Sequence, residues 1–222
     1  MSGEKKEEFI KNWKSHATFY EEALVYMEKR KEGKIHSFKT PWKKINDAGI
    51  QGWEYNSIII IAARPGGGKT LMKDQAIREG FKINSGQGVR ALEFQFEMVG
   101  RNSKIREFSA VSKQSYKYLC SAETEGVTVD QELIDKCRKY AASAAKYPID
   151  IVDIPLPVVG LKNTIINYMN HHYKKDGRYP KTIITLDHSV LVQKENKQST
   201  LDMLNALGVT ILRLMIYLEE MR

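Results

Sequence analysis

Short runs of β-branched and apolar residues alternate along the chain with longer segments of mixed apolar and polar residues. The densest run, Ser57–Ala62 with sequence SIIIIA, predicts a strand buried on both faces of a sheet. Similar runs predict strands at residues 89–96, 149–154 and 182–187, and the intervening patterns predict helices at residues 41–47, 69–82, 100–111, 130–146, 161–174 and 201–221. Strands alternating with helices of ten or more residues predict an α/β fold, with a mostly parallel sheet flanked by helices.

The two ends of the chain have a different pattern. Residues 4–34 form a long charged segment with irregularly spaced apolar positions, which predicts a helix that packs on something else, another subunit being a candidate. We therefore expect an N-terminal helical extension over residues 1–36 and one α/β domain over residues 37–222. A parallel-sheet fold would normally continue with a strand after the last predicted helix, so we expect the sheet to be incomplete at its C-terminal end.

Composition narrows the functional classes only slightly. The chain has 222 residues and a formal net charge of +8, which suits a polyanionic partner without requiring one. No apolar run approaches the roughly 18 residues of a membrane span, and the N-terminus lacks the apolar core of a secretory signal. We expect a cytoplasmic protein with no membrane contact, in which Cys120 and Cys137 are reduced thiols.

The segment after the first predicted strand, residues 63–70, reads A-R-P-G-G-G-K-T, and a predicted helix follows it. A glycine-rich loop between a strand and a helix is typical of a phosphate-binding loop, because backbone N–H groups and the helix N-terminus face one bound anion. Lys69 would reach the β- and γ-phosphates, and the Thr70 hydroxyl would bind Mg²⁺. The expected nucleotide-binding residues are Ala63, Arg64, Pro65, Gly66, Gly67, Gly68, Lys69, Thr70 and Leu71.

Phosphoryl transfer also needs carboxylates, for the metal ion and for the attacking water. Asp187 ends the fourth predicted strand, and ligands of open parallel sheets bind at the carboxyl ends of the strands. We interpret Asp187 as a second metal ligand beside Thr70. Glu97 follows the second strand and is the preferred general base, with Glu93 inside that strand as the competing acid. Asp150 and Asp153 are weaker candidates at the third strand.

Four motifs resemble those of one family, the DnaB-type replicative helicases. ARPGGGKT at residues 63–70 resembles the family's ARPxxGKT loop, in which alanine also replaces the first glycine. FQFEM at residues 94–98 resembles F-S-L-E-M, whose Glu is the catalytic base. TLDHSVLVQ at residues 185–193 resembles the Walker B segment, with an Asp-His pair closer to hexameric phage helicase-primases. The lead-in at residues 40–53 resembles the family's approach to the first strand.

The resemblance covers residues 37–222 and implies a RecA-like P-loop NTPase core that uses ATP and Mg²⁺. Lys69, Glu97 and Asp187 would be catalytic. It further implies a motor that translocates on single-stranded DNA and unwinds duplex, assembled as a homo-oligomer, in this family a hexameric ring. Primase or a helicase loader would be partners, and a phage-encoded protein would act in the cytoplasm of its bacterial host. The family's polar sensor strand and arginine finger have no counterpart in residues 1–222, which leaves hydrolysis by this chain alone open.

Contacts with DNA are expected from the polar stretch 193–200, in which Lys194, Lys197 and Gln198 are candidates, although a solvated surface loop is an equal alternative. The adjacent pair His171 and His172 is expected at the surface rather than on a metal. Two other functions stay open: a RecA-type recombinase ATPase, and a non-hydrolysing nucleotide-binding assembly module.

Overall fold

A parallel sheet with the strand order β2-β1-β3 forms the centre of the domain. Its strands are β1 (Val89–Gln95), β2 (Ile149–Val152) and β3 (Lys181–Asp187), each within one or two residues of its prediction. The register pairs Gln95 with Asp187, so β1 and β3 end side by side at the carboxyl edge of the sheet. The computed structural model describes residues 14–64, 66–121, 129–187, 192–194 and 197–220, with side chains up to residue 211.

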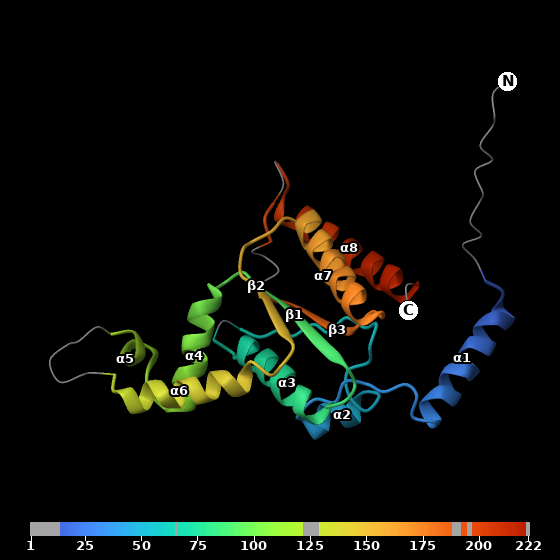
Figure 1. Cartoon of the computed structure of the whole chain (residues 1–222). Coiled ribbons are helices and arrows are strands. Elements are labelled where there is room, and N and C mark those ends of the chain that lie inside the picture. The colour runs from blue at the N-terminus through green and yellow to red at the C-terminus, as the bar shows by residue number, and fades with distance from the viewer. Residues whose placement is uncertain (1–13, 65, 122–128, 188–191, 195–196, 221–222) are drawn as a thin grey trace.

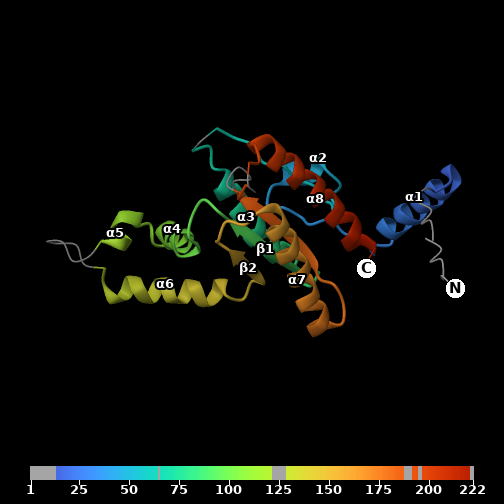
Figure 2. The same cartoon turned by 90° about the horizontal axis from the view of Figure 1, so that it is seen from above.

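Helices cover both faces of the sheet, as Figures 1 and 2 show. On one face lie α7 (Val158–Asp176) and α8 (Thr200–Glu220), and on the other lie α2 (Lys43–Ala48) and α3 (Lys69–Ile83). The helices α4 (Gly100–Ser112), α5 (Tyr116–Cys120) and α6 (Gln131–Ala144) project together to one side. The sequence predicted all of these except α5, a single short turn capped by the Ser115 side chain.

Alternate residues of β1 divide the core into two clusters. Leu92 and Phe94 face α7 and α8, in a cluster completed by Phe96, Val158, Leu161, Ile165, Met169, Val192, Met203 and Leu207. Val89 and Ala91 belong to the cluster on the α3 side, together with Phe38, Ile77 and Phe81. Because strand side chains alternate between faces, Glu93 and Gln95 also point toward α3. Two buried polar residues therefore lie beneath the helix that follows the phosphate loop.

The predicted strand at residues 57–62 is not part of the sheet, and this prediction is wrong for the described structure. The segment forms neither a strand nor an isolated bridge, and Ile58, Ile59 and Ile60 are 46%, 47% and 84% exposed. A run of isoleucines favours a strand that is buried on both faces. It does not show whether the neighbouring strands and helices that would bury it are present. Among the described residues, no strand pairs with the outer edge of β3.

The N-terminal extension is a helix that projects from the domain. Residues 1–13 of the predicted segment lie outside the described part, and α1 spans His16–Lys31 with Ser15 as its side-chain N-cap. None of its residues is buried, and its apolar side chains Phe19, Tyr20, Leu24, Val25 and Met27 are exposed. In the described part of the chain, no helix is long and apolar enough to cross a membrane.

Candidate nucleotide-binding site

The phosphate loop has a backbone that requires glycine at successive positions. Gly66 and Gly68 have φ angles of +75° and +79°, which L side chains rarely adopt. At Gly67 the restriction is spatial, since a Cβ there would lie 2.9 Å from both the Ala63 Cβ and the Arg64 carbonyl oxygen. The Gly67 N–H donates to that same oxygen at 2.9 Å, closing a tight turn. Pro65 lies outside the described residues.

Helix α3 starts at Lys69, so the last two residues of the loop motif, Lys69 and Thr70, lie at the positive N-terminal end of a helix. The Lys69 ammonium group lies 3.4 Å from the Ala63 carbonyl oxygen, folded back over the loop. Thr70 is half-buried, whereas the Leu71 side chain is 69% exposed.

The Thr70 hydroxyl donates a hydrogen bond of 2.9 Å to the Asp187 carboxylate at the end of β3. A hydroxyl and a carboxylate are oxygen ligands of the kind that Mg²⁺ takes in nucleotide sites. The two residues predicted to bind the metal are thus brought together from opposite parts of the chain, next to the glycine loop. This donor set and the loop conformation fit a Mg²⁺–nucleotide complex.

Glu97 lies in the bend just after β1 and is exposed. Because β1 and β3 are parallel and end together, Glu97 is at the same sheet edge as Asp187. Glu93, the competing acid, is 4% exposed and engaged by Lys73 at 3.0 Å and by the Gln95 amide at 2.7 Å. The assignment of the general base to Glu97 remains a prediction, favoured by the internal pairing of its competitor.

The comparisons with known proteins agree with this geometry. The model of the DnaB-like helicase C-terminal domain family matches residues 37–207, which is most of the chain. The chain belongs to this family. No curated protein matches it.

Two solved structures resemble the DnaB-like domain in fold. One is described as an ATPase domain and has 14% sequence identity and a TM-score of 0.67, over 89% of this chain and 67% of that one. A DnaB-like replicative helicase, described together with its interactions with primase, has 17% identity and a TM-score of 0.64, over 87% of this chain. The chain spans 46% of that second protein. At these identities the likeness establishes the RecA-like fold.

A buried ion pair that sequence analysis missed supports the site from below. Lys73, one turn after Lys69, contacts both Glu93 and Asp74 at 3.0 Å and is 8% exposed. Burial lowers the pKa of Lys73, but the attraction of Glu93 and Asp74 outweighs it and raises the pKa above its ordinary value. The sequence signal for this ion pair was a Lys four residues after the start of the helix and a Glu inside the next strand. The pair ties α3 to β1 beneath the phosphate loop.

The other candidate acids have structural partners in the DnaB-like domain. The Asp153 carboxylate accepts from the Gly100 backbone N–H at 2.8 Å and so caps α4. The Asp150 carboxylate accepts from the Tyr168 hydroxyl at 2.8 Å and lies 3.7 Å from Arg90. These contacts give both carboxylates a structural role, and the sequence had made them only the weaker candidates for catalysis.

The surface expectation for the histidine pair is half wrong. His171 is exposed, but His172 is 5% exposed and packs edge-on against Tyr168. The face of α7 that His172 occupies also carries Ile165 and Met169 in the core, and this helical spacing was the missed signal. The described residues contain no group of three potential metal ligands.

The predicted DNA-binding stretch is only partly described. Lys194 and Lys197 are exposed and Gln198 is half-buried, whereas residues 188–191, including His188, and residues 195–196 lie outside the described part. Val192 is buried and Gln193 pairs with Pro157, which anchors the start of the stretch. The contacts with DNA stay predictions.

Proposed function

We propose that this DnaB-like domain is the ATP-hydrolysing motor of a replicative helicase that translocates on single-stranded DNA to unwind duplex. The observation that carries the proposal is the Thr70–Asp187 contact beside the glycine loop. It joins the metal-binding hydroxyl of a phosphate loop to a strand-end carboxylate, the arrangement that phosphoryl transfer in P-loop NTPases requires. Family membership supports the helicase role over a recombinase.

Each residue has a distinct role in the proposed reaction. The N–H groups of Gly66, Gly67 and Gly68 bind phosphate oxygens, and the Lys69 ammonium group offsets charge on the β- and γ-phosphates. Thr70 and Asp187 hold Mg²⁺, which supplies Lewis-acid stabilisation of the phosphate oxygens when bound.

Glu97 orients the attacking water and accepts its proton. Its exposed position after β1 is compatible with this role, since water has to reach it. Arg64 flanks the nucleotide and is exposed in the described structure.

The active assembly would be a homo-oligomer, as a hexameric ring, with nucleotide bound between neighbouring subunits. The five exposed apolar side chains of α1 support this, because they provide a surface that a second copy can cover. Lys194, Lys197 and Gln198 would contact the DNA backbone. Primase or a helicase loader would be further partners, in the cytoplasm of a bacterial cell or of a phage host.

The deciding experiment is ATP turnover with and without single-stranded DNA, with Lys69→Ala as the blank. DNA-stimulated turnover that disappears in Lys69→Ala is expected from a motor. In Glu97→Gln, Mg-ATP should still bind while turnover falls by two orders of magnitude or more, the scale of losing a general base.

A non-hydrolysing assembly module is the second candidate. The exposure of Ile58, Ile59 and Ile60 favours it, because the segment before the phosphate loop is not held in the sheet. Lys69-dependent nucleotide binding with no turnover under any condition would support this candidate and contradict the motor.

A further inference from the structure

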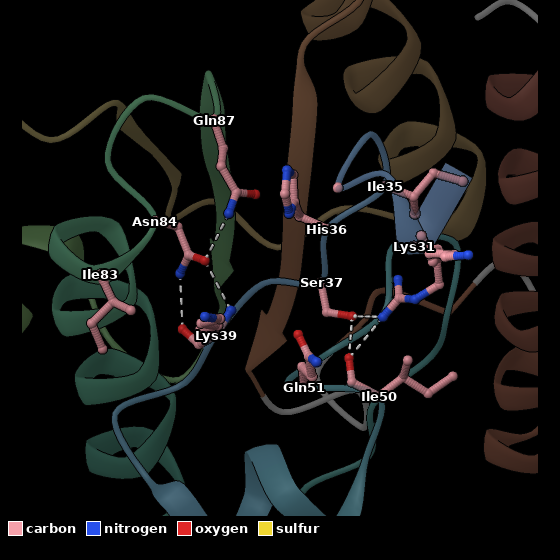
Figure 3. A pocket seen from close by; sticks show the side chains of 12 residues that line it. Lys31, Ile35, His36, Ser37, Lys39, Ile50, Gln51, Ile83, Asn84 and Gln87 are labelled. Atoms are coloured by element: carbon pink, nitrogen blue, oxygen red, sulfur yellow. Dashed lines mark hydrogen bonds between the residues drawn. The ribbon is translucent and has the colours of Figure 1, made fainter. Parts of the chain in front are cut away.

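A basic cavity lies at the end of the domain opposite the phosphate loop, and Figure 3 shows its walls. Its volume is about 540 Å³, and it lies between the end of α1, the residues after it and the turn that joins α3 to β1. Asn84 and Gln87 belong to that turn, at the amino edge of the sheet. The nucleotide site occupies the carboxyl edge, so the two sites are at opposite ends of β1.

A second cavity of about 600 Å³ continues the first one. Both are lined by Lys39, Gln51 and Ile83, so together they form one depression that runs past the Lys39 side chain. We call this the basic depression. Two adjoining cavities of this volume suit an extended ligand better than a single small ion.

The charge of the basic depression is strongly one-sided. The cations Arg30, Lys31 and Lys39 line the first cavity, together with the imidazole of His36, and it has no acidic lining residue in the described part of the chain. In the second cavity the described lining has one acid, Asp47, which is neutralised by an ion pair with Lys43. The residues that line the depression therefore carry a net positive charge.

The Arg30 guanidinium contributes a half-buried part of this charge. Its Nη2 donates to the Ser37 hydroxyl at 2.9 Å and to the Ile50 carbonyl oxygen at 3.0 Å. Its Nη1 is buried without a hydrogen-bond partner, and no described carboxylate forms an ion pair with it. The guanidinium carbon also lies 5.7 Å from the centroid of the Tyr26 ring. An anion that reached Nη1 would give this N–H group the partner it lacks.

The backbone that carries Lys39 is held in place, while its ammonium group stays free to bind. The Asn84 side chain accepts from the Lys39 N–H at 2.9 Å and donates to the Lys39 carbonyl oxygen at 2.8 Å. Gln87 donates to the Asn84 side chain at 3.1 Å, which fixes that clamp (Figure 3). A side-chain change at Lys39 therefore leaves the local fold intact.

We propose that the basic depression binds the phosphates of a nucleic-acid strand, at a place separate from the stretch 193–200. Several cations on one depression, Arg30, Lys31 and Lys39, suit a ligand with repeated negative charges. Among the described residues that line it there is no Phe, Tyr or Trp on which bases could stack, so recognition is through the backbone and independent of sequence. This goes beyond the proposed function and needs no nucleotide hydrolysis.

The test is the salt dependence of oligothymidylate binding, measured by fluorescence anisotropy without nucleotide. For single strands the slope of log K against log salt changes by about 0.7 for each phosphate contact, so Lys31→Gln/Lys39→Gln should flatten it by about 1.4. Lys39→Arg should keep the native slope. Lys162→Gln, on the exposed surface of α7, is the matched control and should change nothing.

Three outcomes would overturn the proposal. One is an unchanged slope in the double variant, with its thermal unfolding shown to be native. Another is Lys39-dependent binding of tripolyphosphate alone, which would make the ligand a small phosphate compound. The third is Lys39-dependent binding of a polyglutamate peptide but not of the oligonucleotide, which would make the depression a protein-docking site. Repeating the titration in Lys69→Ala separates this proposal from the motor, because the flattening should persist there.

Discussion

The Thr70 hydroxyl and the Asp187 carboxylate are hydrogen-bonded at 2.9 Å although 117 residues separate them in the sequence. The contact exists because β3 pairs directly with β1 and ends beside the first turn of α3. Two residues that were predicted from separate motifs therefore lie in one site.

A double-mutant cycle on this pair tests whether the two residues act as a unit. Thr70→Ala and Asp187→Asn should each lower kcat/KM for Mg-ATP by on the order of 100-fold, the scale of losing one preorganised electrostatic contact. Together they should lose little more than either one alone, because residues that share a role are not additive. Thr164→Ala on α7 is the control, and full additivity would show that the two residues act separately.

Gly67→Ala should disrupt the phosphate loop without unfolding the domain. The added methyl would lie 2.9 Å from both the Ala63 Cβ and the Arg64 carbonyl oxygen, so the loop has to move. We expect a loss of nucleotide affinity of at least tenfold in a direct binding titration. Gly208→Ala is the counterpart, because a Cβ in that helix meets nothing within 4 Å and should stabilise the fold by about 0.5–1 kcal/mol. Equal nucleotide affinity in both variants would contradict this account of the loop.

The sequence predicted the elements better than their partners. Hydrophobic periodicity located β1, β2 and β3 and the long helices, because burial on one face or both leaves a repeat in the chain. The same reasoning failed at Ser57–Ala62. The pattern there indicates a preference for a buried strand, but it does not show whether other elements bury the segment. Buried polar residues were also missed, since the pairing of Lys73 with Glu93 is visible only after α3 packs on β1.

The Lys73–Glu93 pair should be essential only as a pair. Lys73→Met leaves Glu93 buried without its cation and should lower the free energy of unfolding by about 3–5 kcal/mol. The double change Lys73→Met/Glu93→Leu should recover much of this loss in urea unfolding. Lys43→Met, which breaks the exposed pair with Asp47, should have little effect. A double variant no more stable than Lys73→Met would show that the loss of stability comes from the contacts of Gln95 and Asp74 and not from the unpaired Glu93.

Stability should decline in mild acid because of His172. Burial lowers its pKa, and the positive charges of Arg90 and His171 act in the same direction, against the weaker opposing effects of Asp150 and Asp176. A depressed pKa in the folded state gives stability that is present above the unfolded value of about 6.5 and is lost as the pH falls below it.

The urea unfolding free energy at pH 7.5, 6.0 and 5.0 should therefore fall less in His172→Phe than in the native chain. His16→Phe, at an exposed position on α1, controls for the change of side chain and should keep the native pH dependence. Parallel pH profiles for the native chain and His172→Phe would exclude His172 as the source.

The unpaired outer edge of β3 has a consequence for amide exchange with solvent. In a parallel strand, successive N–H groups point alternately to the two sides, and the described sheet bonds only the side that faces β1. Deuterium should therefore enter every second amide of β3 quickly while the amides between them stay protected. If another segment completes the sheet in an assembled state, that alternation should disappear, giving a residue-by-residue readout of assembly.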